Sequence, residues 1–508
     1  MARYAIGDAA ARTPRNVALE VYDAATCGRL ERWTFESLQD AVLRTSAALS
    51  AIGLTRGDRV VVKLENTSQY AVTFFGAVAG GFIPIPASAG LTPRETAFVV
   101  GNSRAKLLVS SDGDPGLQGG AGLIRLNAGD LADAVNAVEP ASYADTAADD
   151  PAYLIYTSGT TAAPKGVLHA HSAAWGRRPM YRDWYGLGAG DRMLHAGAFN
   201  WTYTLGTGLT DPWANGATAL VALGAKPPQT WPSLIRETGA TIFAAVPGIY
   251  RQMLKYADDL DDLGALRHGL MAGEAPPLTL RPDWTDATGL PIYEALGMSE
   301  ISTYVSTSPD VPPRDGSAGR PQSGRSIAIL PPDAPRGRDE QVMPLPAGEE
   351  GLLAVHRSDP GMMLGYWELP DEDAAVSVGE WFVGGDLARM DDDGYVFHLG
   401  RETDVMNAGG FRVSPAELED VLCAVNGVHE IACAEVEVRE DVRVICAFVV
   451  MSETAPDWSE LEATLRRRAD ENLAPQKRPR AYRKVNTLTR TANGKLQRSA
   501  LARGFVRD

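Results

Sequence analysis

Apolar and polar positions follow two rhythms along the chain, one typical of buried strands and one typical of amphipathic helices. Apolar runs at 59–64, 106–110 and 241–246 predict short strands buried on both faces. The stretch from Thr34 to Ala51 repeats its apolar residues with helical spacing instead. Because strands and helices alternate over about the first 400 residues, the pattern predicts an α/β fold with layered, largely parallel sheets.

The segment 68–93 is apolar enough to require a comparison with membrane helices, since it carries no charged residue. A spanning helix needs ~20 continuous apolar residues, whereas a glycine pair and two prolines interrupt this run. The pattern therefore predicts a buried helix over 70–79 and a short strand near 82–85. No membrane partner is expected.

Two regions show neither helical nor strand periodicity, and a predicted domain boundary lies near Gly400-Arg401. Residues 111–150 are rich in Gly, Ala and Asp, which predicts a loosely structured excursion. Residues 309–341 are rich in Pro, Arg and Asp, which predicts a surface loop. The last hundred or so residues then form a separate small α+β unit, within the usual size range of a domain.

This C-terminal unit begins with a helix-start signature. Ser414 is a candidate N-cap, Pro415 suits the first helical position, and Glu417 stands three residues after the cap. Strand-like runs follow at 430–438 and 441–450, and a helix is predicted over 458–472.

Composition narrows the class of protein. A chain of 508 residues is too long for one ordinary core, and 45% apolar residues suit a globular protein. The net charge of −16 argues against a general nucleic-acid binder. The four cysteines form no Cys-x-x-Cys pair, so neither a disulfide framework nor a zinc site is expected. A reducing cytoplasm is the expected setting, since the N-terminus also lacks an apolar signal-peptide core.

The densest candidate chemistry lies between Tyr156 and Gly166, directly after an apolar run at 153–155 that predicts a strand. Hydroxyl side chains, a glycine and Lys165 gather in one turn, which can direct N–H groups, hydroxyls and an ammonium at a polyanion such as a nucleoside triphosphate. The Walker A pattern fails because Lys165 precedes Gly166.

The order Ser-Gly-Thr-Thr followed by Pro-Lys-Gly resembles the phosphate loop of the acyl-adenylate-forming enzymes, a superfamily of acyl-CoA synthetases, adenylation domains and luciferases. Later segments add to this resemblance in the family's order. They are Met271 to Pro276, Glu294 to Glu300, Trp381 to Asp386, Gly394 to Arg401, Asn407 to Val413, and Thr491 to Leu496. The resemblance covers nearly the whole chain. Three positions depart from the family's usual residues: Ala162, Leu296 and Thr403.

The resemblance implies a fold and a domain organisation. A large N-terminal domain of layered α/β sheets, residues 1–400, would bind AMP and the acyl group. Residues 401–404 would form a hinge, and residues 405–508 a small, mobile α+β domain. Rotation about the hinge would exchange two active conformations.

The resemblance also implies a nucleotide site and a catalytic set. Lys495, Glu300, Lys165 and Ser299 would be catalytic, and Glu300 would hold Mg²⁺, which prefers hard oxygen ligands. Asp386 and Arg401 would contact the ribose. The full ATP and AMP set is Thr157, Ser158, Gly159, Thr160, Thr161, Lys165, Gly273, Glu274, Ala275, Leu296, Gly297, Met298, Ser299, Asp386 and Arg401.

The acyl and thiol sites follow from the same resemblance. Residues 195–206 are similar to the acyl-pocket segment of benzoate-type aryl-CoA ligases, and residues 211–217 to medium-chain acyl-CoA synthetases. The implied acyl pocket comprises Trp201, Thr202, Tyr203, Gly297 and Thr303. Benzoate-type enzymes can carry a His where Thr303 stands. The implied CoA tunnel comprises Gly409, Gly410, Phe411 and Arg412.

We therefore expect an ATP-dependent ligase that joins a small carboxylic acid to CoA through an acyl-adenylate and releases pyrophosphate and AMP. An aryl, small cyclic or medium-chain acid is the expected substrate. The alternatives are a stand-alone adenylation enzyme that loads a carrier protein and a non-enzymatic nucleotide sensor. A seryl hydrolase and a zincin are excluded, since neither Gly-x-Ser-x-Gly nor His-Glu-x-x-His occurs. A homo-oligomer is compatible with the sequence.

Overall fold

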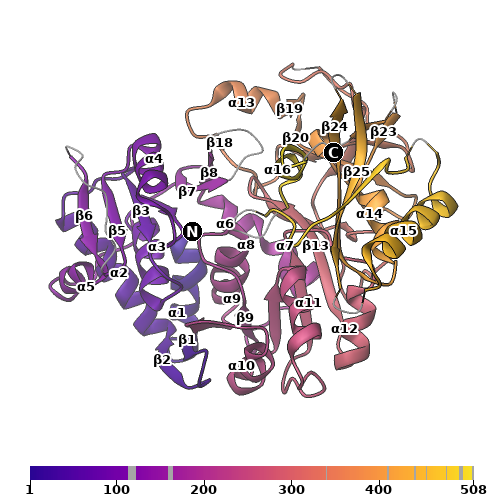
Figure 1. Cartoon of the computed structure of the whole chain (residues 1–508). Helices are drawn as coiled ribbons and strands as arrows, with labels where there is room; N and C mark the ends of the chain where they lie inside the picture. Colours follow the sequence, from indigo (N-terminus) through magenta and orange to yellow (C-terminus); the bar gives the residue numbers. More distant parts are fainter. Residues whose placement is uncertain are drawn as a thin grey trace. The chain divides into compact units, whose positions relative to one another are not determined.

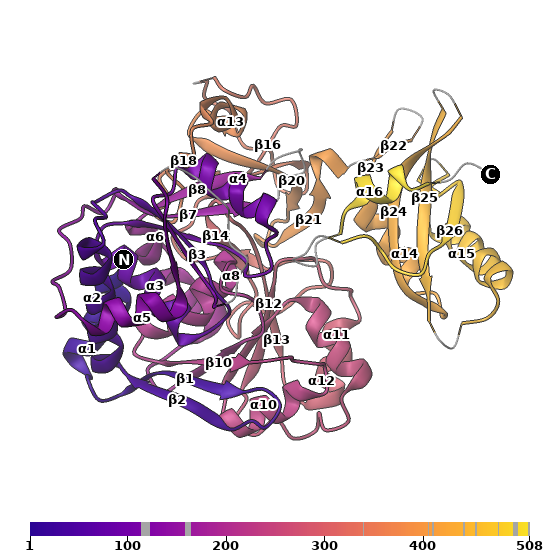
Figure 2. The ribbon, with the colours of Figure 1, turned by 60° about the vertical axis from the view of Figure 1, so that its left-hand side comes forward.

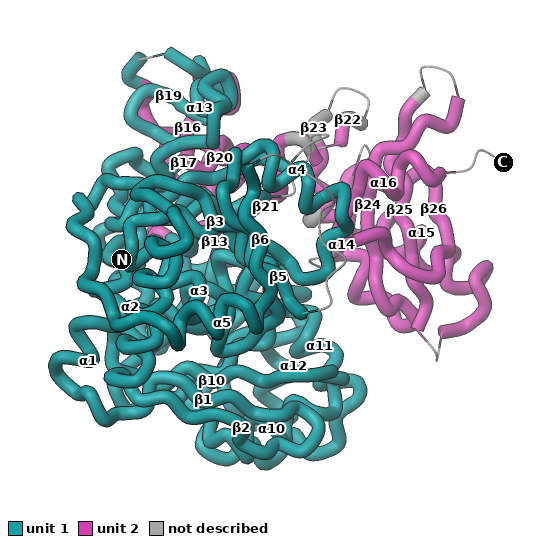
Figure 3. Tube along the Cα trace, turned by 90° about the vertical axis from the view of Figure 1, so that its left-hand side faces the viewer, with its two compact units in different colours: residues 1–327, 335–341, 355–382 teal, residues 328–334, 342–354, 383–508 magenta. Residues whose placement is uncertain are grey.

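The computed structural model of the chain is shown in Figure 1. It describes residues 1–112, 122–157, 164–338, 340–404, 406–408, 411–439, 442–452, 455–475, 477–490 and 496–505. The chain divides into two compact units, coloured separately in Figure 3. Unit 1 holds residues 1–327, 335–341 and 355–382, and unit 2 holds residues 328–334, 342–354 and 383–508.

A long mixed sheet forms the centre of unit 1, in the order β15-β14-β13-β12-β11-β9-β10-β1-β2. Neighbours from β13 to β1 pair in parallel, whereas β2, β14 and β15 pair antiparallel at the two ends. The strands are β1 (Val17–Asp23), β2 (Arg29–Thr34), β9 (Arg192–His195), β10 (Thr218–Leu223), β11 (Ile242–Ala245), β12 (His268–Ala272), β13 (Ile292–Met298), β14 (Ser302–Ser306) and β15 (Arg320–Pro321). The predicted α/β fold with largely parallel sheets is confirmed.

Both faces of this sheet are buried. Along β11, Phe243 and Ala245 belong to one apolar cluster, and Ile242 and Ala244 belong to another. Successive side chains of a strand point to opposite faces, so the clusters cover opposite sides of the sheet. The first cluster includes residues of α10 (Thr230–Thr238), α11 (Pro247–Tyr256) and α12 (Leu280–Thr288), which appear together in Figure 2. The second includes Trp184 of the π-helical turn η2 (Tyr181–Tyr185).

A second, parallel sheet runs in the order β4-β3-β5-β6. Its strands are β3 (Arg59–Lys63), β4 (Ile83–Pro86), β5 (Leu107–Ser110) and β6 (Ile124–Asn127), and the helices near it in sequence are α2 (Phe35–Ala51), α3 (Ser68–Ala79), α4 (Pro93–Ser103) and α5 (Ala128–Asn136). Helix α3 is buried almost entirely. In the described part of the chain, no helix combines the length and apolar character that crossing a membrane demands.

A third sheet carries the candidate phosphate loop. Strands β7 (Pro151–Thr157) and β8 (Lys165–Ala170) form an antiparallel hairpin, and β18 (Gly365–Tyr366) pairs with β8 in the order β18-β8-β7. The short helix α13 (Pro370–Ala375) begins a few residues after β18. Residues from two distant parts of the sequence therefore meet at β8.

The remaining sheets lie toward the C-terminal end of the sequence. One runs β16-β17-β20-β19 with β21 paired to β20, another pairs β22 with β23, and a third runs β24-β25-β26. Their strands are β16 (Ile327–Leu330), β17 (Glu350–His356), β19 (Ser377–Val378), β20 (Trp381–Met390), β21 (Val396–Arg401), β22 (Met406–Ala408), β23 (Phe411–Val413), β24 (Val428–Arg439), β25 (Val442–Met451) and β26 (Ala481–Lys484).

In unit 2, two clusters cover the β24–β25 ribbon. Ile431 and Cys433 join a core with α14 (Pro415–Cys423) and α15 (Trp458–Asn472), while Ala432 and Ala434 join a cluster with Leu501 of α16 (Arg498–Arg503). The helix predicted over 458–472 is confirmed, and both predicted strands are present.

Shorter helical pieces complete the described structure. They are η1 (Arg3–Gly7), α1 (Asp8–Arg12), α6 (Ser172–Gly176), α7 (Arg178–Met180), α8 (Thr202–Leu205), η3 (Gly206–Thr210), α9 (Asp211–Ala214) and the 3₁₀ turn η4 (Glu402–Asp404).

Two expectations about local structure were wrong, whereas the predicted helix start at Ser414 is confirmed. The region 111–150 contains β6 and α5, where Asn127 and Asp130 form a capping box that the Gly- and Ala-rich composition concealed. The region 309–341 contains β15 and β16. Ser414 does occupy the N-cap of α14, but its hydroxyl donates to the Leu399 carbonyl instead of capping the helix.

Candidate functional site

The candidate phosphate loop starts and ends in the hairpin of β7 and β8. Thr157 lies opposite Lys165, and the Thr157 hydroxyl donates to the Lys165 carbonyl at 3.4 Å. This pairing holds the two ends of the loop side by side. The predicted ATP-binding residues Ser158, Gly159, Thr160 and Thr161, and the departure at Ala162, lie outside the described residues.

Lys165 has a carboxylate partner from a remote part of the sequence. Its Nζ lies 2.5 Å from Oε2 of Glu372 on α13, and 5.4 Å from the centroid of the Tyr366 ring. The Lys165 side chain is 21% exposed, so the ammonium stays accessible to an incoming anion. Glu372 was absent from the sequence-based site, because a partner 207 positions away leaves no local signal.

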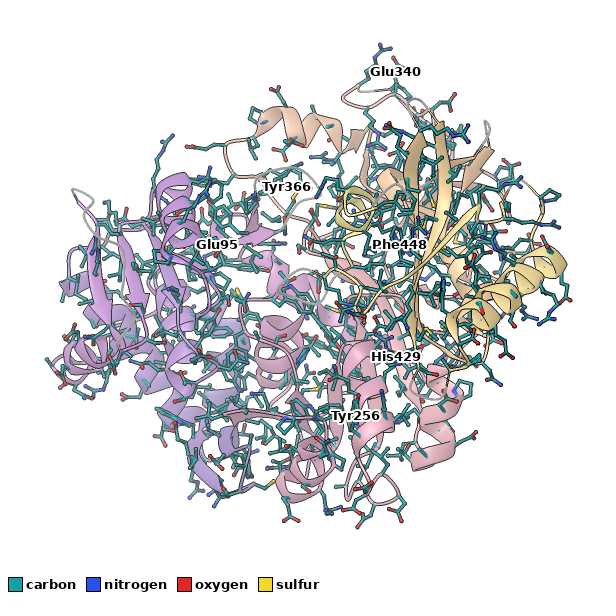
Figure 4. The ribbon with its side chains drawn as sticks, viewed as in Figure 1. Glu95, Tyr256, Glu340, Tyr366, His429 and Phe448 are labelled. Atoms are coloured by element: carbon teal, nitrogen blue, oxygen red, sulfur yellow. The ribbon has the colours of Figure 1, made fainter. Side chains whose placement is uncertain are left out.

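Tyr366 contacts both Lys165 and Glu300, the predicted metal ligand. Its hydroxyl donates to Oε1 of Glu300 at 2.7 Å, while its ring faces the Lys165 ammonium. Tyr366 is labelled in Figure 4. A cation and a carboxylate that the sequence placed in one active site are therefore brought together through a single aromatic side chain.

Glu300 and Ser299 follow β13, and a histidine of β8 holds their main chain. His169 Nε2 lies 2.8 Å from the Ser299 carbonyl, so this nitrogen carries the proton and donates. Burial lowers the pKa of His169 to about 4, which keeps the ring neutral. The ring also stacks on Tyr153 of β7 at 4.8 Å. The hairpin that starts and ends the phosphate loop thus also positions Ser299.

The last residues of β13 pack closely against β14 at Gly297. A Cβ at this position would lie 2.5 Å from the Ser302 carbonyl oxygen and 2.6 Å from the Thr303 Cα, so a side chain does not fit. Ser302 has a φ of +82°, a conformation that non-glycine residues rarely adopt. The side chains of Leu296 and Met298 are half-buried on the same strand.

A buried ion pair between Arg177 and Asp211 contacts Ser302, the first residue of β14. The Arg177 guanidinium donates to Asp211 at 2.6 Å and also to the Ser302 hydroxyl. Although burial alone would lower the pKa of Arg177, Asp211 raises it overall, so the arginine stays charged. Gly206 lies against the guanidinium, since a Cβ there would come within 2.2 Å of it. The sequence analysis missed this ion pair, whose members lie far apart along the chain.

The predicted adenine and acyl segments meet at Gly273. This glycine follows β12 with a φ of +101°, and a Cβ on it would lie 3.8 Å from the Trp201 ring. The next residue, Glu274, accepts a hydrogen bond from the Gly248 N–H at 3.2 Å. Ala275, the next residue, is exposed. The structure therefore places Trp201 beside the turn that the resemblance assigns to adenine.

Tyr203, the second predicted acyl-pocket aromatic, is half-buried and packs against the cluster that contains Trp184. Its ring stacks on Trp184 at 5.8 Å, and its hydroxyl is directed at the carbonyls of Leu270 and Ala245, at 3.3 and 3.4 Å. Thr202 begins helix α8 and is half-buried. The Thr303 hydroxyl contacts the Met180 sulfur at 2.6 Å, and Met180 belongs to the same apolar cluster as Trp184.

In unit 2, the predicted ribose residues face each other across two strands. Asp386 of β20 lies opposite Arg401 of β21, and Arg401 Nε is 2.9 Å from Asp386 Oδ1. His398 Nε2 lies 3.0 Å from the same oxygen, a contact that the sequence analysis did not foresee. Arg401 also donates to the Gly384 carbonyl at 2.7 Å. The side chains of Arg401 and His398 therefore both contact the Asp386 carboxylate and fix its position.

The residues predicted for the CoA tunnel and the C-terminal lysine lie only partly within the described part of the chain. Phe411 and Arg412 belong to β23, which pairs with β22. The residues Gly409, Gly410 and Lys495 lie outside the described part of the chain. Their roles stay predictions, as does the hinge at 401–404.

Among the described residues, no group of three or more His, Cys, Asp and Glu side chains could by itself hold a metal ion. Mg²⁺ commonly takes one or two carboxylates and completes its shell with substrate phosphates and water. The Glu300 carboxylate, held from one side by Tyr366, fits such a partial protein shell.

Comparison with known proteins identifies close relatives. The benzoate–CoA ligase of Thauera aromatica is 31% identical over 92% of this chain and 90% of the relative. The 3-hydroxybenzoate–CoA ligase of an Aromatoleum strain is 28% identical over 94% and 92%. The crystal structure of the anthranilate CoA ligase AuaEII with anthranoyl-AMP superposes with a TM-score of 0.86, at 27% identity over 97% of this chain and 96% of that one.

Family models match most of the chain. The AMP-binding enzyme model matches residues 6–367, and the AMP-binding enzyme C-terminal domain model matches residues 417–495. The resemblance inferred from the motifs and the predicted fold class are confirmed. The chain belongs to the AMP-binding enzyme family.

Proposed function

We infer that the protein is an ATP-dependent carboxylic acid:CoA ligase that forms an acyl-adenylate and then an acyl-CoA. The observation that carries this inference is the arrangement around Tyr366. Its ring faces the Lys165 ammonium at 5.4 Å, and its hydroxyl donates to Glu300 at 2.7 Å. The relatives named as CoA ligases favour this activity over loading of a carrier protein.

A carboxylic acid needs activation because hydroxide is a poor leaving group. We propose that the acid's carboxylate attacks the α-phosphorus of ATP, that pyrophosphate leaves, and that a thiol then displaces AMP. Such phosphoryl chemistry depends mainly on positioning and on stabilising developing charge. Lys165 would meet the phosphates, Ser299 the α-phosphate, and Glu300 would hold Mg²⁺, which supplies further charge neutralisation when bound.

The remaining roles follow the resemblance. Asp386 and Arg401 would hold the ribose, and Lys495 would bridge the attacking carboxylate and the α-phosphate. Gly409 and Gly410 would then line the path of the pantetheine arm after the domain 405–508 rotates about residues 401–404.

We propose an aryl acid as the substrate. The half-buried Tyr203 ring stacks on the buried Trp184 and supplies a flat apolar wall, which suits an aromatic ring. We also propose a reducing, cytoplasmic setting, supported by the absence of any Cys-x-x-Cys pair among the four cysteines of the sequence.

Pyrophosphate release across a panel of carboxylic acids tests the proposal. We expect ATP cleavage to AMP with benzoate-type acids, and acyl-CoA in the mass spectrum after CoA is added. Failure to cleave ATP with every acid would refute the ligase. An acylated carrier protein without acyl-CoA would identify the carrier-loading activity instead.

A further inference from the structure

His195 ends strand β9, directly before the segment assigned to the acyl pocket, and its tautomer follows from one contact. The Gly197 N–H donates to His195 Nδ1 at 2.9 Å, so Nδ1 carries a lone pair. Burial lowers the pKa of His195 to about 3, and the ring is therefore neutral. A neutral imidazole with an accepting Nδ1 must carry its proton on Nε2.

This Nε2–H group is buried and has no hydrogen-bond partner among the described residues. His195 as a whole is only 9% exposed. Leaving a buried donor unsatisfied destabilises a folded protein, so such groups usually bind a water or a ligand. The other buried histidines of this region contrast with it: His169 Nε2 donates to Ser299, and His268 Nε2 donates to the Tyr185 carbonyl at 2.8 Å.

The ring of His195 is held at the aromatic wall of the proposed acyl pocket. Its centroid lies 4.4 Å from that of Tyr203, with the two planes at 74°. Two glycines fix its position, because a Cβ would lie 3.1 Å from the His195 Cε1 at Gly197 and 3.2 Å from the His195 Cβ at Gly208. A side chain at either glycine would push against the imidazole.

The hydrogen-bond donors around His195 differ in whether they have an acceptor among the described residues. The Tyr203 hydroxyl is directed at the Leu270 and Ala245 carbonyls. The Trp184 N–H donates to the Tyr293 carbonyl at 3.1 Å. Both aromatic side chains thus present apolar surface, whereas His195 Nε2 and the neighbouring buried hydroxyl of Thr204 have no hydrogen-bond partner among the described residues.

We propose that His195 is a specificity-determining residue whose Nε2–H donates a hydrogen bond to a ring substituent of the acid. The substrate class is then an aryl carboxylate bearing an oxygen acceptor, such as a hydroxybenzoate, in preference to benzoate itself. This inference rests on the proposed function, since it deepens the assignment of the acyl pocket. A pocket that hydrogen-bonds a substrate hydroxyl discriminates against the analogue that lacks it, because the protein donor is then left unpaired.

The first experiment uses the wild-type protein. Pyrophosphate release is measured with benzoate and with 2-, 3- and 4-hydroxybenzoate at saturating ATP. We expect one hydroxybenzoate to exceed benzoate in kcat/KM by roughly 10- to 100-fold. Equal or better use of benzoate would overturn the inference and leave the ligase activity established. Absence of release with all acids would refute the proposed function itself.

The second experiment compares three variants with the same acids. H195F removes the donor and keeps a flat ring, so we expect the preference to fall to within ~3-fold of unity. H195Q returns an amide N–H on a side chain of similar reach, so we expect it to retain most of the preference. The matched control H268Q changes a buried histidine whose Nε2 is satisfied by a main-chain carbonyl, and its preference should equal that of the wild type.

The variants separate a hydrogen bond to substrate from a merely structural role. A structural role predicts that H195F and H195Q lower kcat/KM for benzoate and hydroxybenzoates by the same factor. An Nε2–H directed at the Tyr203 ring would give the same uniform result. Either outcome would overturn the inference, and the wild-type comparison remains decisive if H195F fails to fold.

Discussion

Lys165 Nζ and Glu372 Oε2 lie 2.5 Å apart, which pairs the lysine of the phosphate-loop motif with a carboxylate from helix α13. The pair is partly exposed, at 21% and 39% of the two side chains. In the proposed role of Lys165, ATP phosphates would compete with Glu372 for the lysine, and the balance between them would set part of the apparent affinity for nucleotide.

Substitution of Glu372 tests this competition. We expect Glu372→Gln to lower the KM for ATP by ~2- to 5-fold, because partly exposed ion pairs contribute below about 1 kcal/mol. Steady-state kinetics with varied ATP provide the measurement. Glu368→Gln serves as a matched control, since Glu368 pairs with Arg104 at 2.9 Å instead. A raised KM in Glu372→Gln would show that the carboxylate assists nucleotide binding.

The Tyr366 hydroxyl is expected to orient Glu300. Tyr366→Phe removes a hydrogen bond to a charged group, which typically contributes ~1.5–3 kcal/mol, so kcat/KM for ATP should fall roughly 10- to 100-fold. The Mg²⁺ concentration needed for half-maximal rate should rise. Tyr22→Phe removes a similar bond to the buried Glu20, at 2.8 Å, and should leave the Mg²⁺ dependence unchanged. An unaltered Mg²⁺ dependence in Tyr366→Phe would separate Tyr366 from the metal site.

Asp386 is expected to hold the ribose hydroxyls. Asp386→Ala removes both the acceptor and the partner of Arg401, so the KM for ATP should rise at least ~10-fold. Calorimetric titration with ATP provides an independent measurement. Asp392→Ala, in the exposed turn between β20 and β21, is the control. An unchanged KM would remove Asp386 from the ribose site.

Lys495 should act in the first half-reaction alone. Lys495→Ala is expected to abolish formation of the acyl-adenylate and to spare thioester formation from supplied acyl-adenylate, because the lysine stabilises charge at the α-phosphate. Single-turnover assays of each half-reaction make the comparison. Lys477→Ala removes a lysine that pairs with Glu417 at 2.6 Å, and it should affect neither half-reaction. Equal loss of both half-reactions in Lys495→Ala would contradict the two-conformation scheme.

Buried neutral histidines should make the fold acid-sensitive. Burial lowers the pKa of His169 to about 4 and that of His195 to about 3, whereas an unfolded histidine titrates near ~6.5. Between pH 6.5 and 4 the unfolded chain therefore binds protons that the folded chain does not, and the free energy of unfolding falls as pH falls. Each ring should contribute ~1.4 kcal/mol per pH unit, or ~2 kcal/mol at pH 5.

Urea unfolding at pH 8 and pH 5 measures this effect. In His195→Phe the difference between the two pH values should shrink by ~2 kcal/mol relative to the wild type, since one titrating group is lost. A difference of the same size in both proteins would show that the His195 ring is already protonated in the folded state.

Local pattern and motif order were sufficient to predict much of the fold and the family to which the chain belongs. Helix α15 and strand β3 carry strong periodicity or a continuous apolar run, and Lys165 and Glu300 stand in recognisable motifs. The partners of these residues were not predictable, because Glu372 and Tyr366 reach them only after β18 pairs with β8.

Contacts between segments that are distant in sequence account for the remaining differences. The Ser414 hydroxyl donates to the Leu399 carbonyl, 15 residues earlier in the chain, and accepts no capping hydrogen bond from α14. The buried Arg177–Asp211 pair likewise gave no local signal, since its members lie 34 positions apart. Side-chain choices of this kind depend on which segments meet, and a single sequence does not record that.

The two glycines that enclose His195 have a consequence for redesign. Because a Cβ at Gly197 would lie 3.1 Å from His195 Cε1 and one at Gly208 would lie 3.2 Å from His195 Cβ, a side chain added at either glycine would crowd residue 195. A smaller residue at 195 would vacate a ring-sized space next to Tyr203 without moving the backbone. An engineer seeking to admit a longer para- or meta-substituted acid would begin by truncating this one position and leaving both glycines untouched.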